Sequence, residues 1–74
     1  MKVNIEFDMP EDQDELILAL KGKELWSILF DLDQKLRNYT KYDNPKIDTN
    51  TAEVIRNELH ELMDNYNISL DMVD

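Results

Sequence analysis

The fold of this chain is decided by residues 25–36, whose sequence is LWSILFDLDQKL. Apolar side chains recur there every three or four positions, which is the spacing of one face of an α-helix. The pattern continues to Tyr39, and the turn signal Asp43-Asn44-Pro45 follows it. We therefore expect a helix over residues 23–41. Its apolar stripe is formed by Leu25, Ile28, Leu29, Leu32, Leu36 and Tyr39.

A shorter helix is expected before this one, over residues 11–21. Pro10 is well suited to open a helix, because the first turn needs no N–H from it. Acidic residues crowd the next positions, where the positive end of the helix dipole favours them. Gly22 is expected to end the helix, since glycine is a common terminator. The acidic residues of the first turns are Glu11, Asp12, Asp14 and Glu15.

A third helix is expected over residues 51–66. Thr49 or Thr51 is suited to cap its start, and Asn67 is suited to end it in a left-handed conformation. The apolar stripe of this helix is formed by Ala52, Ile55, Leu59, Leu62, Met63 and Tyr66.

The two ends of the chain alternate between apolar and polar side chains, as extended strands do. Residues 1–8 alternate strongly until Pro10, and residues 68–72 alternate more weakly. We expect the N-terminal strand to pair either with this tail or with its copy in a second chain, because an unpaired strand leaves its backbone groups unsatisfied. The predicted fold is a single α+β domain, residues 1–74, mostly helical, with one N-terminal strand, three helices and a short extended C-terminal tail.

Charge and composition favour a protein partner over nucleic acid or a membrane. The 74 residues include 17 acids and 8 bases, a net charge of −9, which repels phosphate backbones and anionic lipid surfaces. The chain has no cysteine, so it has neither a disulfide nor a thiolate zinc ligand. No apolar run approaches the roughly 20 residues that span a bilayer, and the start lacks the pattern of a signal peptide. We therefore expect a cytoplasmic protein that meets a basic surface.

The acidic residues are concentrated in two segments. Residues 1–24 carry seven acids and three bases, net −4, and residues 48–74 carry seven acids and one base, net −6. Residues 25–47 carry three acids and four bases, net +1. If the first and third helices share a side, their carboxylates imitate a phosphate backbone and fit a basic cleft. The alternative is that the charge serves only solubility and the helix dipoles.

The residues capable of chemistry do not form a recognisable active site in the sequence. His60 is the only histidine, and we expect it to pair with Asp64, one turn along. The carboxylates of residues 11–15 are explained by a helix start, with a cation site as the weaker alternative. No phosphate-binding glycine motif is present. We therefore expect neither an enzyme nor a bound metal or cofactor.

Two aromatic residues, Trp26 and Phe30, lie one helical turn apart beside the apolar stripe. Two large rings in that place exceed what a single stripe needs. Asp33 lies near them, with Arg37 one turn further on. A plain Asp33–Arg37 ion pair and a protein interface formed by all four residues are equal alternatives.

Three stretches of the chain carry a resemblance to a known group of proteins. They are MKVNIEFDMPE at residues 1–11, LWSILFDLDQ with Leu36-Arg37, and the close from Ile55-Arg56 through Leu59-His60-Glu61 to Ser69-Leu70-Asp71. Together they resemble short acidic proteins encoded by tailed bacteriophages and prophages. Such proteins typically have Asp-Gln-Trp in the middle helix, where this chain has Asp33-Gln34-Lys35. The resemblance implies no catalytic residues, but it implies a phage context, in which small acidic proteins often inhibit host enzymes or defence complexes.

The function predicted from these features is binding. We expect a small acidic phage-type protein that binds and inhibits a host nucleic-acid-handling or defence protein in the host cytoplasm, with nucleic-acid mimicry as one route. The alternative is a self-associating accessory module, a homodimer with no inhibitory role. The residues expected to contact a partner are Glu11, Asp12, Asp14, Glu15, Trp26, Phe30, Asp33, Glu58, Glu61 and Asp64.

Overall fold

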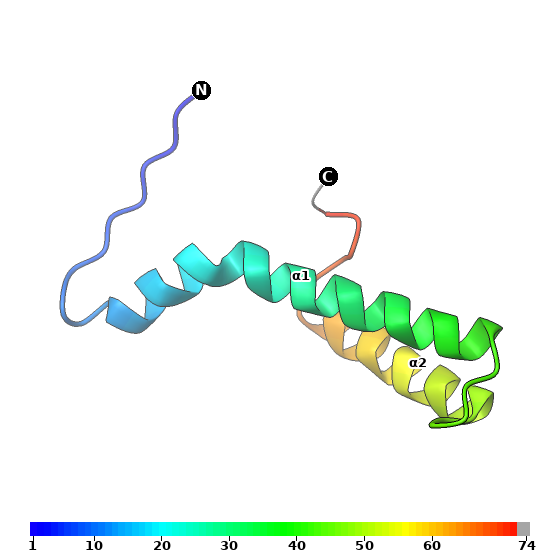
Figure 1. Cartoon of the computed structure of the whole chain (residues 1–74). Coiled ribbons are helices and arrows are strands. Elements are labelled where there is room, and N and C mark those ends of the chain that lie inside the picture. The colour runs from blue at the N-terminus through cyan, green and yellow to red at the C-terminus, as the bar shows by residue number, and fades with distance from the viewer. Residues whose placement is uncertain (73–74) are drawn as a thin grey trace.

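A computed structural model describes residues 1–72 of the chain and shows two helices joined by a short loop (Figure 1). Helix α1 spans Gln13–Lys41 and helix α2 spans Thr49–Asn65. The two helices run antiparallel, as the path of the chain in Figure 1 shows. The predicted α+β class, with one strand and three helices, is therefore wrong. Over the described residues the fold is a helical hairpin.

Helix α1 is continuous where the sequence predicted two helices, residues 11–21 and 23–41. Gly22 lies within it and has no positive φ, so it is not the left-handed terminator expected of it. A glycine inside a helix costs about 1 kcal/mol. Its neighbours Lys21 and Lys23 are strong helix formers, and the unbroken ladder of backbone hydrogen bonds outweighs the cost. The predicted end of the helix at Lys41 is confirmed.

The N-terminal segment, residues 1–8, forms no strand, contrary to the prediction. Figure 1 shows it leaving the start of α1 as an extended arm, well apart from the C-terminal tail. A strand needs a neighbour to satisfy its backbone groups, so alternation alone does not produce one. Val3 and Ile5, on the apolar side of the arm, are both exposed.

The two ends of α2 are closed by local interactions. Asp48, rather than Thr49 or Thr51, is the N-cap: its carboxylate accepts from the Thr51 hydroxyl at 2.5 Å and from the Thr51 backbone N–H at 2.9 Å. These hydrogen bonds, led by that from the hydroxyl, lower the pKa of Asp48. At the other end Asn67 has a φ of 57°, which confirms the expected left-handed terminator.

The turn after α2 redirects the tail. The N–H of Asn67 donates to the Asp64 carbonyl at 3.1 Å, and the N–H of Ile68 donates to the Met63 carbonyl at 2.9 Å. This pair of bonds is a Schellman motif. It directs residues 68–72 toward α1 as irregular turns, so the extended tail that the sequence predicted is not formed.

Helix α2 covers only the C-terminal part of α1. The helices have 29 and 17 residues, which correspond to about 43 Å and about 26 Å. Because His60 contacts Asp33, the last residue of α2 lies beside about residue 28 of α1. We call residues 13–25, which extend past the end of α2 in Figure 1, the overhang. The buried apolar core consists of Leu36, Ala52 and Met63.

The hairpin is elongated. Its principal extents are 49 × 28 × 20 Å, and its radius of gyration is 16.6 Å. A compact chain of this length has a radius of gyration of about 11 Å. The overhang and the N-terminal arm account for the difference, because both extend beyond the part of the molecule where α1 and α2 pack together.

Candidate protein-binding surface

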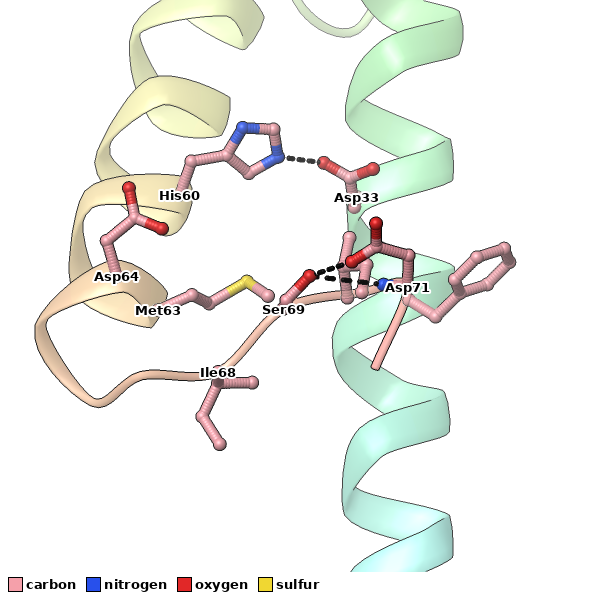
Figure 2. Close-up of a pocket in the computed structure, with 9 residues that line it drawn as sticks. Asp33, His60, Met63, Asp64, Ile68, Ser69 and Asp71 are labelled. Carbon is pink, nitrogen blue, oxygen red and sulfur yellow. Dashed lines mark hydrogen bonds and ion pairs between the residues drawn. The ribbon is translucent and has the colours of Figure 1, made fainter. Parts of the chain in front are cut away.

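A buried ionic cluster joins the two helices. Asp33 of α1 is only 3% exposed. Arg56 of α2 donates to its carboxylate from Nε to Oδ1 at 2.9 Å and from Nη2 to Oδ2 at 3.3 Å. His60, one turn along α2, contacts Oδ1 through Nε2 at 2.5 Å, and Figure 2 shows its ring reaching across to Asp33. The cluster fixes α2 against α1.

Two opposing effects act on the pKa of Asp33. Burial raises it, because the charged form loses its water. Hydrogen bonds from Arg56 and His60, together with their positive charge, lower it. The second effect prevails, so the pKa of Asp33 lies below its usual value. Asp33 is therefore ionised at neutral pH, and its charge is compensated inside the hairpin.

Asp33 and His60 have partners other than those that the sequence predicted. Within residues 1–72 no ion pair joins Asp33 to Arg37 or His60 to Asp64. Spacing along a single helix suggested both pairs, whereas the real partners are 23 and 27 residues apart in the sequence. Because Asp33 is enclosed between the helices, the structure does not place it on a surface open to a partner.

A cavity of about 420 Å³ lies where α1, α2 and the tail meet (Figure 2). Inside it the Ser69 hydroxyl hydrogen-bonds Asp71, while His60 contacts Asp33, so the serine and the histidine are engaged separately. In the described part of the chain no three His, Cys, Asp or Glu side chains are grouped to hold a metal. The cavity is therefore lined by polar and apolar side chains together, and its serine and histidine do not form a nucleophile–base pair. Its apolar lining is Phe30, Met63, Ile68 and Leu70.

The aromatic pair expected from the sequence is present. The rings of Trp26 and Phe30 stack with centroids 5.3 Å apart and planes at 24°. Phe30 lines the cavity, and Trp26 is partly buried. The Trp26 Nε1 is enclosed and has no hydrogen-bond partner among residues 1–72. The pair thus packs on the side of α1 that the tail approaches.

The acidic residues expected to contact a partner occupy two separate places. Residues 11–15 lie at the free end of the overhang (Figure 1), where Asp12 accepts a hydrogen bond from the N–H of Asp8 at 2.8 Å. The second group is exposed on the C-terminal half of α2. The length of the overhang separates the two groups, so they are not adjacent. The second group is Glu58, Glu61 and Asp64.

An exposed apolar stripe runs along α1, and the sequence had assigned most of it to the core. Leu18, Leu25, Ile28 and Leu32 are all exposed. At 100° per residue they fall within an arc of about 80°. The centre of this arc is rotated by about 70° from the direction in which Asp33 and Leu36 face α2. Ile28 and Leu32 therefore lie beside the contact with α2, whereas Leu18 and Leu25 lie nearly in line with Leu36 but beyond the end of α2.

Helix α2 carries a matching stripe. Ile55, Leu62 and Tyr66 are exposed, and they are rotated by about 70°, in the same sense along the chain, from the buried Ala52 and Met63. Each stripe is rotated in the same sense from the direction in which its helix faces the other helix. Because the helices run in opposite directions, these two rotations bring both stripes to the same side of the hairpin. We call this combined surface the apolar face. It consists of Leu18, Leu25, Ile28, Leu32, Ile55, Leu62 and Tyr66.

Comparisons of the chain with protein-family models, with curated proteins and with solved structures returned no match. Over the described residues neither helix is long and apolar enough to cross a membrane.

Proposed function

We propose that this chain is a non-enzymatic protein-binding module that docks through its apolar face. The observation that carries the proposal is the imbalance between seven exposed apolar residues on this face and three buried ones in the core. Burial of apolar area stabilises a complex by about 25 cal/mol per Å² before the costs of association. A contiguous exposed apolar surface with polar residues around it is typical of an interaction site.

The form of the face supports the same function. Two antiparallel helices with apolar stripes turned to one side form a two-helix surface, and an amphipathic helix packs along such a surface. The Asp33–Arg56–His60 cluster holds the two helices of this surface together. A face that is rigid before binding loses less conformational entropy when a partner docks.

Site-specific photocrosslinking tests this function. A photoreactive residue is placed at Leu25, on the apolar face, or at Asp31, which is exposed and faces away from α2. In cells that make the chain we expect covalent protein adducts from position 25 and few from position 31. Equal yields at both positions, or no adduct at either, would contradict the proposal.

A second candidate function rests on the acidic residues. Within the described chain, Glu58, Glu61 and Asp64 form no ion pair, and neither do the acids of residues 11–15. We propose as the alternative that these carboxylates contact a basic protein of the host cytoplasm, in the manner of a phage-encoded inhibitor that imitates nucleic acid. The lack of ion pairs at these carboxylates supports this role, because charge that is not neutralised internally is available to an external basic surface.

Salt dependence tests the acidic alternative. A basic partner captured from bacterial lysate on the immobilised chain is expected to elute as salt rises, because screening weakens charge contacts. A triple variant, Glu58→Gln with Glu61→Gln and Asp64→Asn, is expected to lose this retention, whereas Leu25→Glu is expected to keep it. Retention that survives in the triple variant would exclude Glu58, Glu61 and Asp64 from the contact.

A further inference from the structure

We infer that the apolar face is occupied by a second copy of this chain, arranged antiparallel, with the overhang of each copy packed against α1 and α2 of the other. This inference rests on the proposed function and names the partner of the same face. Each end of such a dimer is a three-helix bundle formed by α1, α2 and the overhang of the second copy.

The surface area of the single chain is the first argument. The chain exposes 6614 Å², whereas a compact monomer of 8.8 kDa exposes about 4,800 Å². A standard protein–protein interface buries about 800 Å² on each partner. The excess of about 1,800 Å² therefore exceeds what one side of a stable dimer requires, even though the N-terminal arm contributes part of it.

The register of the leucines is the second argument. Leu18, Leu25 and Leu32 are spaced by seven residues, so these three leucines are symmetric about Leu25. Antiparallel pairing of two α1 helices about a two-fold axis at Leu25 places Leu18 beside Leu32 of the second copy. Heptad spacing of this kind is the pattern of helices that pack along one another. The three leucines are thus self-complementary.

Charge selects the antiparallel direction. Asp14 precedes Leu25 by about the same distance along α1 as Lys35 follows it; Asp14 lies in line with the stripe and Lys35 lies just beside it. Antiparallel pairing brings Asp14 of one copy near Lys35 of the other. Parallel pairing places Asp14 beside Asp14 of the second copy and Lys35 beside Lys35, and like charges repel. The contact between opposite charges favours the antiparallel dimer.

The lengths of the elements also fit. The overhang, residues 13–25, is about 20 Å long, and α2 is about 26 Å long. The overhang of the second copy is therefore long enough to lie along most of α2, where it covers the exposed Ile55, Leu62 and Tyr66. The arrangement closes on itself under two-fold symmetry, so it predicts a dimer and not a fibre.

The molar mass tests the inference directly. Sedimentation equilibrium of the full chain is expected to give twice the chain mass of 8.8 kDa. Leu25→Glu is expected to weaken the dimer at least about a hundred-fold, because each dimer then buries two unpaired carboxylates. Leu20→Glu is the matched control, since Leu20 is 70% exposed but lies off the apolar face. A monomeric parent chain, or equal weakening by both variants, would overturn the inference.

The register has its own test, because the chain contains no cysteine. Leu25→Cys is expected to form a disulfide-linked dimer on mild oxidation, and Leu20→Cys is not. A mixture of Leu18→Cys and Leu32→Cys chains is expected to give mainly the mixed dimer. Preferential linkage of position 18 in one chain to position 18 in the other would exclude the antiparallel register.

The two proposals fail in different ways. If the parent chain sediments as a monomer while position 25 crosslinks to other proteins, the second copy is rejected and the binding function stands. If position 25 crosslinks to nothing, the binding function is rejected as well. Crosslinking of position 25 to another chain of the same sequence supports both.

Discussion

Asp33 is the residue on which the hairpin depends most. It accepts hydrogen bonds from Arg56 and contacts His60, so a single carboxylate serves two side chains of the opposite helix. A carboxylate this deeply buried is tolerated only because it is paired. The small apolar core gives little else to hold α2 in place.

Replacement of Asp33 therefore destabilises the fold. We expect Asp33→Asn to lower the free energy of unfolding by about 2 kcal/mol, because charge-assisted hydrogen bonds to Arg56 and His60 are lost. The measurement is urea unfolding at a fixed protein concentration, since an oligomer is stabilised by mass action. Asp31→Asn, on the exposed side of the same helix, is expected to change stability by less than about 0.5 kcal/mol. Equal effects of the two variants would contradict the role of the cluster.

The same residue sets the acid limit of stability. Because the pKa of Asp33 is lower in the folded chain than in the unfolded chain, its contribution is complete above the unfolded pKa of about 3.9. The contribution is lost as pH falls through the lower folded pKa. Thermal unfolding followed by circular dichroism is expected to show a fall in stability below about pH 4 that is shallower in Asp33→Asn. Some of the fall remains in the variant, because the pKa of Asp48 is also lowered.

At the scale of elements, the continuity of α1 across Gly22 positions the overhang. A methyl group added at Gly22 meets nothing within 4 Å. Gly22→Ala is therefore expected to stabilise the chain by about 0.5–1 kcal/mol, and Ala19→Gly, one turn earlier, to destabilise it by a similar amount. Urea unfolding compares the two. Destabilisation by Gly22→Ala would show that the helix ends at residue 22.

Local signals predicted some elements well. The turn at Asp43-Asn44-Pro45 and the left-handed Asn67 both depend on the residues involved and their nearest neighbours. Gly22 also carries a local signal, but flanking helix formers override it. The pattern of residues 1–8 predicted a strand wrongly, because a strand depends on a partner segment that the described chain does not supply.

The surfaces were harder to predict than the helices. The apolar positions of α1 span a wider arc than one partner helix covers, so the stripe alone does not show which part turns inward. Leu36 turns toward α2, whereas Ile28 and Leu32 lie beside the contact and Leu25 lies beyond the end of α2. The Asp33–Arg56–His60 cluster joins residues of different helices, so no spacing within one helix reveals it.

At the scale of the whole molecule, apolar area and net charge act in opposite directions on self-association. Each chain carries a net charge of −9, so two copies repel. Raising salt from about 0.01 M to about 1 M shortens the Debye length from about 30 Å to about 3 Å. The dimer is therefore expected to tighten with salt in sedimentation experiments. A dimer that loosens with salt would show that charge pairs, not the apolar face, hold it together.

Two tyrosines report most directly on whether the apolar face is covered in solution. In the single chain Tyr66, on the face, is 78% exposed, and Tyr42, in the loop after α1, is 67% exposed. Hydroxyl-radical footprinting of the purified chain, read by mass spectrometry, compares their oxidation rates. A covered face predicts that Tyr66 is oxidised several-fold more slowly than Tyr42. The exposure of the two tyrosines in the single chain requires that Tyr66 be oxidised at the same rate as Tyr42 or faster. That result would contradict a covered apolar face.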